Sequence, residues 1–77
     1  MSDEITFDRI TFDKGIMSGQ ACIRGMRIPA SVIVNLVAQG QSNEEIIIDY
    51  PVITNEDIKQ CLEYAAWILS REYVYSF

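Results

Sequence analysis

Apolar residues recur at helical spacing through the second half of the chain, whereas the first half alternates short apolar runs with glycine. Between residues 31 and 70, apolar side chains return every three or four positions, which places them on one face of a helix. Before residue 31, β-branched and aromatic residues form short runs that favour extended chain. The pattern predicts one domain over residues 1–77, with strands and turns over 1–30, three helices over 31–70 and a tail over 71–77.

The first two predicted helices have start and stop signals. Ser31 is expected to cap the first helix, which ends at Gly40, because glycine readily adopts the left-handed conformation that follows a helix. Ser42 and Glu45 have the capping-box spacing, in which each side chain binds the backbone amide of the other residue. Pro51 ends the second helix, because the residue before a proline disfavours helical backbone.

The third predicted helix is the longest. Thr54 and Asp57 have capping-box spacing, with aspartate in place of the more common glutamate or glutamine. The apolar residues that follow at helical spacing are expected to face the core: Ile58, Leu62, Ala65, Ala66 and Leu69. Three capped helices with short connections predict a mainly α fold, a three-helix bundle preceded by short N-terminal β-strands.

The N-terminal segment contains a five-residue pattern that occurs twice in tandem. Ile5–Arg9 has the sequence Ile-Thr-Phe-Asp-Arg, and Ile10–Lys14 repeats it with lysine at the end. Since side chains alternate between the two faces of a strand, an odd repeat puts the second apolar pair on the opposite face. Either the chain bends near Arg9, or another subunit covers the second face. We therefore expect a homodimer, with contacts at Ile5, Phe7, Ile10 and Phe12.

The charge of the chain is negative and unevenly distributed. Eleven acidic and six basic residues give a net charge of −5, and the whole excess lies in residues 31–77. A negative chain is not attracted in bulk to phosphate backbones or anionic lipid. The N-terminus is acidic without the apolar core of a signal sequence, and no apolar stretch approaches the length of a membrane span. These features predict a soluble cytoplasmic protein without membrane contact.

Residue types needed for common catalytic and metal sites are scarce. The sequence has no histidine, the commonest general base and metal ligand. Cys22 and Cys61 alone cannot complete a closed zinc site, and two cysteines are too few for a disulfide framework. Gly19 and Gly25 do not form a phosphate-binding loop, because the lysine and the helix of such a loop are missing around them. We therefore expect no enzyme activity, no cofactor and no metal, and two buried thiols.

The most distinctive motif runs from Gly19 to Pro29, with the sequence Gly-Gln-Ala-Cys-Ile-Arg-Gly-Met-Arg-Ile-Pro. It resembles the opening signature of the domain-of-unknown-function 433 family. Further segments resemble the family at matching spacing: Arg9–Asp13, Ala38–Ser42, Glu44–Ile46, Asp49–Pro51, Thr54–Ile58 and Leu62–Ala65. The resemblance covers residues 9–66, and Met26 departs from it because the family usually has threonine there.

The resemblance implies a homeodomain-like three-helix fold with a helix-turn-helix, short N-terminal strands and frequent dimers. It also implies an antitoxin of the Vap type, which is often paired with a PIN-like nuclease toxin. In such a fold the second helix covers about residues 43–49 and the third helix starts after Thr54. The first turns of the third helix would then face the major groove of bound DNA.

Two regions are candidates for nucleic-acid contact. Arg24 and Arg27 lie in the charge-balanced N-terminal part, where they either bind phosphate groups or pair with local carboxylates and carbonyls. At the start of the third helix, Asn55 and Gln60 have side chains that can bind adenine edges. Three carboxylates against one lysine disfavour an approach of this region to phosphates, so we expect it to face solvent or protein.

The acidic helices suit a basic protein partner better than DNA. Asp49, Glu56 and Glu63 are expected to be exposed, and they are complementary to a nuclease channel that attracts RNA phosphates. We therefore expect an antitoxin-like protein that neutralises a PIN-like nuclease, with autoregulatory DNA binding as an additional role. Two alternatives remain, a stand-alone helix-turn-helix transcriptional regulator and a structural dimerisation module.

Overall fold

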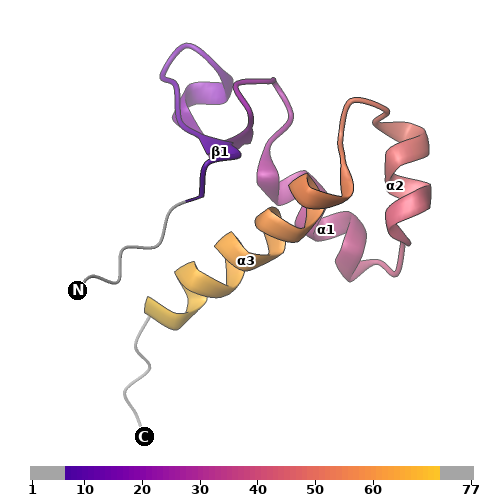
Figure 1. Ribbon diagram of the computed structural model, residues 1–77. Coiled ribbons are helices and arrows are strands. Elements are labelled where there is room, and N and C mark those ends of the chain that lie inside the picture. The colour runs from indigo at the N-terminus through magenta and orange to yellow at the C-terminus, as the bar shows by residue number, and fades with distance from the viewer. Residues whose placement is uncertain (1–6, 72–77) are drawn as a thin grey trace, which may run out of the picture.

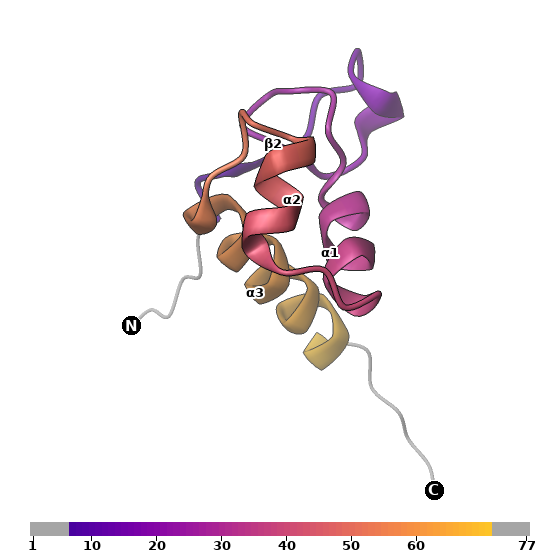
Figure 2. The same ribbon diagram turned by 90° about the vertical axis from the view of Figure 1, so that its right-hand side faces the viewer.

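The structure, a computed structural model, describes residues 7–71, which form three helices and a two-stranded antiparallel sheet (Figure 1). The elements in chain order are β1 (Ile10–Thr11), a 3₁₀ turn η1 (Met17–Gly19), β2 (Cys22–Ile23), α1 (Ala30–Ala38), α2 (Asn43–Asp49) and α3 (Asn55–Arg71). The strands and their connecting turns lie at one side of the helices (Figure 2). The predicted mainly α fold with short N-terminal strands is confirmed.

The tandem repeat is interrupted by a turn. Asp8 and Arg9 form this turn, and the Ile10 amide donates a hydrogen bond of 3.0 Å to the Phe7 carbonyl. The chain therefore bends near Arg9, as one of the two predicted alternatives required. After the bend, Ile10 pairs with Ile23 in the sheet and is buried in the core.

Gly25, the second glycine of the Gly19–Pro29 motif, lies in a tight turn after β2. Arg24 and Gly25 both have positive φ, 46° and 73°, and the Met26 amide donates a 2.8 Å hydrogen bond to the Ile23 carbonyl. Positive φ at both central residues is the conformation of a type I′ turn, which suits glycine at the second position. The sequence Arg24-Gly25 favours a tight turn, because glycine adopts positive φ at little cost, and the structure has the turn there.

Helix α1 starts two residues earlier than the sequence predicted. Pro29, not Ser31, occupies the N-cap position, and Ser31 lies inside the first turn. Proline suits this place because it has no amide hydrogen to leave unpaired and its φ is already fixed. The helix ends at Ala38, and the predicted stop residue Gly40 follows the C-cap with a φ of 94° and an amide that donates to the Val37 carbonyl at 2.9 Å.

Helix α2 begins with the predicted capping box. The Glu45 amide donates to Ser42 Oγ at 3.1 Å, and the Ser42 amide donates to Glu45 Oε1 at 2.8 Å. Both bonds satisfy backbone donors that have no partner inside the helix. Tyr50 then closes the helix, and Pro51 follows it.

Substitution of Ser42 by alanine is expected to lower the free energy of unfolding by about 1 kcal/mol, the usual loss for such a cap. Glu45→Ala should cost less, and the double variant should cost less than the two single losses combined, because both residues serve one helix end. Urea denaturation of the three variants measures these values. Fully additive losses would show that the two residues act independently.

The core-facing side of α3 differs from the predicted stripe. Ile58 and Cys61 are fully buried, whereas Leu62 and Leu69 are 37% and 65% exposed and Ala66 is also exposed. The prediction followed apolar residues alone and so missed Asp57, a charged residue that lies on the buried side. When Asp57 is counted among the inward residues, the buried side of α3 runs through Asp57, Ile58 and Cys61.

The core is built mainly from isoleucines of every helix, of β2 and of the turn before α3. Its fully buried apolar members are Ile23, Ile33, Ile46, Ile53, Ile58 and Cys61. Helix α1 packs against α2 and α3, and α2 connects to α3 through a turn over residues 50–54. This arrangement gives α2 and α3 the positions of the predicted helix-turn-helix and leaves the first turn of α3 next to the strands.

Candidate functional site

Asp57 is the fully buried charged residue among residues 7–71. Its position, the third in α3, makes it the partner of Thr54 in a capping box. The Thr54 amide donates to Asp57 Oδ2 at 2.9 Å, and the Asp57 amide donates to Thr54 Oγ1 at 3.2 Å. The predicted second box is therefore confirmed, although capping is only part of what this carboxylate does.

Two arginines from the N-terminal part converge on the same carboxylate. Arg24 donates from Nε to Oδ1 at 3.0 Å and from Nη2 to Oδ2 at 2.9 Å, a bidentate pair. Arg9 donates from Nη1 to Oδ1 at 3.0 Å, and Arg24 Nη2 also reaches the Val52 carbonyl at 2.6 Å. The cluster of Arg9, Arg24 and Asp57, named here the arginine clamp, ties the strands to the α2–α3 turn and to α3.

The charge state of Asp57 follows from these contacts. Burial by itself favours the neutral acid and raises the pKa, but hydrogen bonds from Arg24, from the Thr54 amide and from Arg9 favour the carboxylate. The balance lowers the pKa of Asp57 from 3.8 to about 2. The hydrogen bond to Asp57 in turn raises the pKa of Arg24. Asp57 is therefore a carboxylate at neutral pH.

The type I′ turn aims Arg24 at Asp57. A φ of 46° is uncommon for arginine, because the left-handed region costs a residue with a Cβ about 1 kcal/mol or more. The bidentate pair and the bond to the Val52 carbonyl offset that cost. The sequence Arg24-Gly25 therefore serves a long-range contact as well as a local turn.

The structure assigns the two predicted nucleic-acid-binding arginines to different environments. Arg24 is held by Asp57 and a carbonyl, which is the local pairing given above as its alternative role. Arg27 is exposed and forms no ion pair with any residue from 7 to 71. Of these two arginines, only Arg27 keeps a guanidinium without an ion pair to residues 7–71.

The side-chain amides of Asn55 and Gln60, which were predicted to contact DNA bases, also form hydrogen bonds within the protein. Gln60 Oε1 accepts a hydrogen bond from the Arg9 amide at 2.6 Å, and Gln60 Nε2 donates to Asp8 Oδ1 at 3.0 Å. Asn55 Oδ1 accepts a bond from Asn43 Nδ2 at 3.1 Å. Gln60 thus holds the N-terminal turn against α3 with both ends of its amide.

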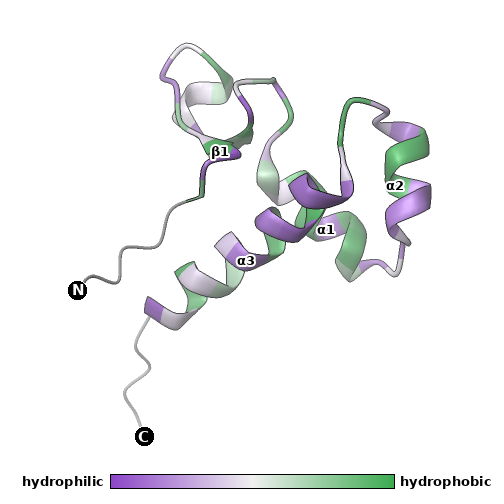
Figure 3. Ribbon diagram, viewed as in Figure 1, coloured by the Kyte–Doolittle hydropathy of each residue, from purple (hydrophilic) through white to green (hydrophobic). Residues whose placement is uncertain are grey.

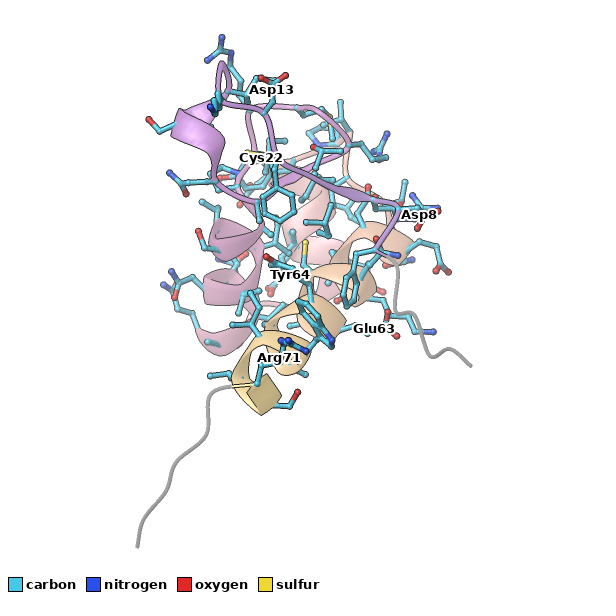
Figure 4. The ribbon with its side chains drawn as sticks, turned by 90° about the vertical axis from the view of Figure 1, so that its left-hand side faces the viewer. Asp8, Asp13, Cys22, Glu63, Tyr64 and Arg71 are labelled. Carbon is cyan, nitrogen blue, oxygen red and sulfur yellow. The ribbon has the colours of Figure 1, made fainter. Side chains whose placement is uncertain are left out.

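The three predicted partner-binding acids are exposed. Glu56 and Glu63 lie two turns apart on α3 and hence on the same side of that helix, and Asp49 lies at the end of α2. Glu63 points away from α1 (Figure 4). None of the three forms an ion pair with the residues that the structure describes. Their charges are available to a partner.

The predicted dimer contacts have diverse environments. Ile10 is buried in the core of the protomer, and Phe7 packs against Tyr64 and Trp67 with ring centroids 5.3 and 5.6 Å away. Phe12 is 60% exposed, although its ring also approaches Tyr64. Ile5 lies outside the described residues, as do positions 72–77 of the predicted tail. Of the described three, Phe12 offers the most surface to another chain.

The predicted buried thiols are confirmed, since both Cys22 and Cys61 are buried and free. Burial, together with the nearby Asp57 charge, raises the pKa of the Cys61 thiol to about 11. Cys61 is therefore protonated at neutral pH and is a poor nucleophile. Within residues 7–71, no three His, Cys, Asp or Glu side chains gather as metal ligands would. The helices of the same residues include none with the length and apolarity to cross a bilayer.

Residues 10–65 match the family model described as protein of unknown function, DUF433. The chain belongs to the DUF433 family. A crystal structure of a DUF433 member protein from Anabaena variabilis ATCC 29413 is similar, with 34% sequence identity and a TM-score of 0.71. The similarity covers 77% of this chain and 58% of the other, so this chain spans little more than half of that relative.

A comparison with curated proteins finds no match. The DUF433 assignment confirms the predicted family, whose matched span contains Arg24 and Asp57 but begins after Arg9. The sequence drew attention to Arg24 only through the Gly19–Pro29 motif that contains it. Nothing in the sequence paired Arg24 with a carboxylate 33 residues away.

Proposed function

We propose that this DUF433 protein is a non-catalytic binding protein that neutralises a PIN-like nuclease, as an antitoxin does. The observation that carries this proposal is the distribution of unpaired charge. Asp49, Glu56 and Glu63 are exposed without ion pairs to the described residues, while Arg9 and Arg24, two of the six basic residues, are engaged by Asp57. The charge that the helices can offer to a partner is therefore mostly negative.

A nuclease is a suitable partner for such a surface. A channel that binds RNA attracts phosphate groups and is therefore basic, and a complementary acidic surface binds it quickly and specifically. The first turns of α3 carry Glu56, and Glu63 continues the same side of the helix. In this mechanism the helix surface blocks the channel by occupying it, with one antitoxin for each nuclease site.

Autoregulatory DNA binding is the weaker candidate. A DNA-binding surface needs several basic groups near phosphates, and Arg24 is already bound to Asp57. Gln60, one of the amides suited to adenine, is also held by Asp8 and Arg9. Of the two arginines predicted to contact nucleic acid, only Arg27 has no ion pair to residues 7–71, and one guanidinium gives little attraction to a phosphate backbone.

An inhibition assay tests the proposal. The genes beside this one are searched for a PIN-like nuclease, which is purified, and its cleavage of RNA is followed while the full chain is added. We expect cleavage to stop near one equivalent, with weaker inhibition at high salt, because salt screens contacts between charged surfaces. Full cleavage in the presence of a large excess of the chain would contradict the proposal.

A further inference from the structure

One long segment of this charged protein contains no charge. From Ile28 to Asn43 the sequence has no Asp, Glu, Lys or Arg, although such residues make up 22% of the chain. The segment includes all of α1, which is mostly green in the hydropathy colouring of Figure 3. The outer side of a surface helix usually carries charged residues. On α1, that side carries Ser31, Asn35 and Ala38 instead.

The same helix forms one wall of an apolar groove. Helices α1 and α3 enclose a groove of about 450 Å³, lined by Ser31, Val34 and Asn35 on one side and by Tyr64, Ile68 and Leu69 on the other. None of the residues that line it is charged. Figure 4 shows the molecule from the side on which Tyr64 lies between the two helices. Leu69, at the groove edge, is 65% exposed.

We infer that this groove is the contact surface between two copies of the chain. Each copy carries a net charge of −5, so two copies repel each other wherever their carboxylates approach. The groove and the exposed side of α1 let them meet without bringing carboxylates together. A basic partner would instead gain from a surface that carries acids, as Asp49, Glu56 and Glu63 do. The absence of charge therefore favours a second copy as the occupant.

A two-fold arrangement uses this surface twice. In a symmetric dimer the same residues face each other on both chains, and Leu69 of each copy enters the groove of the other beside Val34. Removal of Leu69 and the outer side of α1 from water adds to the small core that a chain of 77 residues can build. The contact differs from the N-terminal one predicted from the repeat, because Ile10 is already buried within the protomer.

The test compares three single variants of the full chain by sedimentation equilibrium at micromolar concentration. Leu69→Glu places a carboxylate in the proposed contact. Ile48→Glu is the matched control, because Ile48 is 75% exposed on α2, outside the groove. Phe12→Glu tests the N-terminal alternative. Circular dichroism verifies that each variant is folded.

We expect the wild-type chain, Ile48→Glu and Phe12→Glu to be dimers. Leu69→Glu should weaken the dimer on the order of a hundredfold, because an unpaired carboxylate in an apolar contact is costly. A monomeric wild-type chain would overturn the inference. A folded Leu69→Glu variant that remains fully dimeric would also overturn it. Loss of the dimer in Phe12→Glu would overturn it as well. Loss of the dimer on truncation after Arg71, with Leu69→Glu unaffected, would assign the contact to residues 72–77 and would also overturn it.

Discussion

Replacement of Asp57 by asparagine is expected to lower the free energy of unfolding by about 3 kcal/mol, the largest loss for any single change proposed here. Asparagine has nearly the same size and keeps one oxygen for the cap, but it leaves Arg9 and Arg24 without their shared counter-ion. Their side chains are 34% and 38% exposed, so water stabilises them partly and the loss falls at the lower end for a broken buried pair.

The same substitution should change the acid stability of the protein. The pKa of Asp57 is about 2 in the folded chain and 3.8 in its ordinary state, so the unfolded chain binds a proton more readily. The stabilisation is therefore complete above about pH 5 and disappears as the pH falls through 2. At neutral pH this difference corresponds to about 2 kcal/mol. Asp57→Asn should lose this part of the acid dependence.

Urea denaturation at pH 7, pH 5 and pH 3 measures both effects. Glu56→Gln, a change of the same type at the neighbouring exposed position, is the control and should alter stability by about 0.5 kcal/mol or less. A loss below 1 kcal/mol for Asp57→Asn at pH 7 would contradict the clamp as a major source of stability. If the stability of Asp57→Asn fell as steeply between pH 5 and pH 3 as that of the wild-type chain, the result would contradict the lowered pKa of the carboxylate.

The sequence predicted those parts of the fold that depend on neighbouring residues. The Ser42 and Thr54 boxes, the turn at Gly25 and the stop at Gly40 were all found where the local pattern indicated. Each depends on contacts within a few positions, which a linear sequence displays directly. The cap of α1 lies at Pro29 and not at Ser31, because two residues close together in the sequence can both begin a helix and packing chooses between them.

The clamp could not be predicted in the same way. Arg9 and Arg24 lie 48 and 33 residues from Asp57, and none of the three has a neighbour that reveals the pairing. A charged residue on the inward side of a helix also contradicts the usual expectation that such residues face water. The apolar stripe of α3 was misplaced for this reason, and Leu62 and Leu69 proved to be exposed. Only the tertiary fold brings the three charges together.

Reversal of the acidic surface is expected to have the largest effect on function. The triple variant Asp49→Lys, Glu56→Lys and Glu63→Lys raises the net charge from −5 to +1. All three side chains are exposed, so the fold should survive with a change of roughly 0.5 kcal/mol for each substitution. Affinity for a basic nuclease should fall on the order of a hundredfold or more, since attraction becomes repulsion at three points.

The same variant separates the antitoxin from a stand-alone DNA-binding regulator. If α2 and α3 contact DNA as a helix-turn-helix, the three new lysines add phosphate contacts. Affinity for the promoter should then rise, and its salt dependence should become steeper by about 0.9 for each contact in a log–log plot. Asp13→Lys, an equal charge change at an exposed turn residue, controls for net charge against the single Glu56→Lys variant. Nuclease inhibition and fluorescence anisotropy with promoter DNA, each at two salt concentrations, give both readouts from one preparation.

We expect the triple variant to lose nuclease inhibition, and we expect both the wild-type chain and the variant to bind DNA weakly. Tighter, salt-sensitive DNA binding with inhibition intact would favour the regulator instead, because the reversed surface would then face phosphates and not a basic protein.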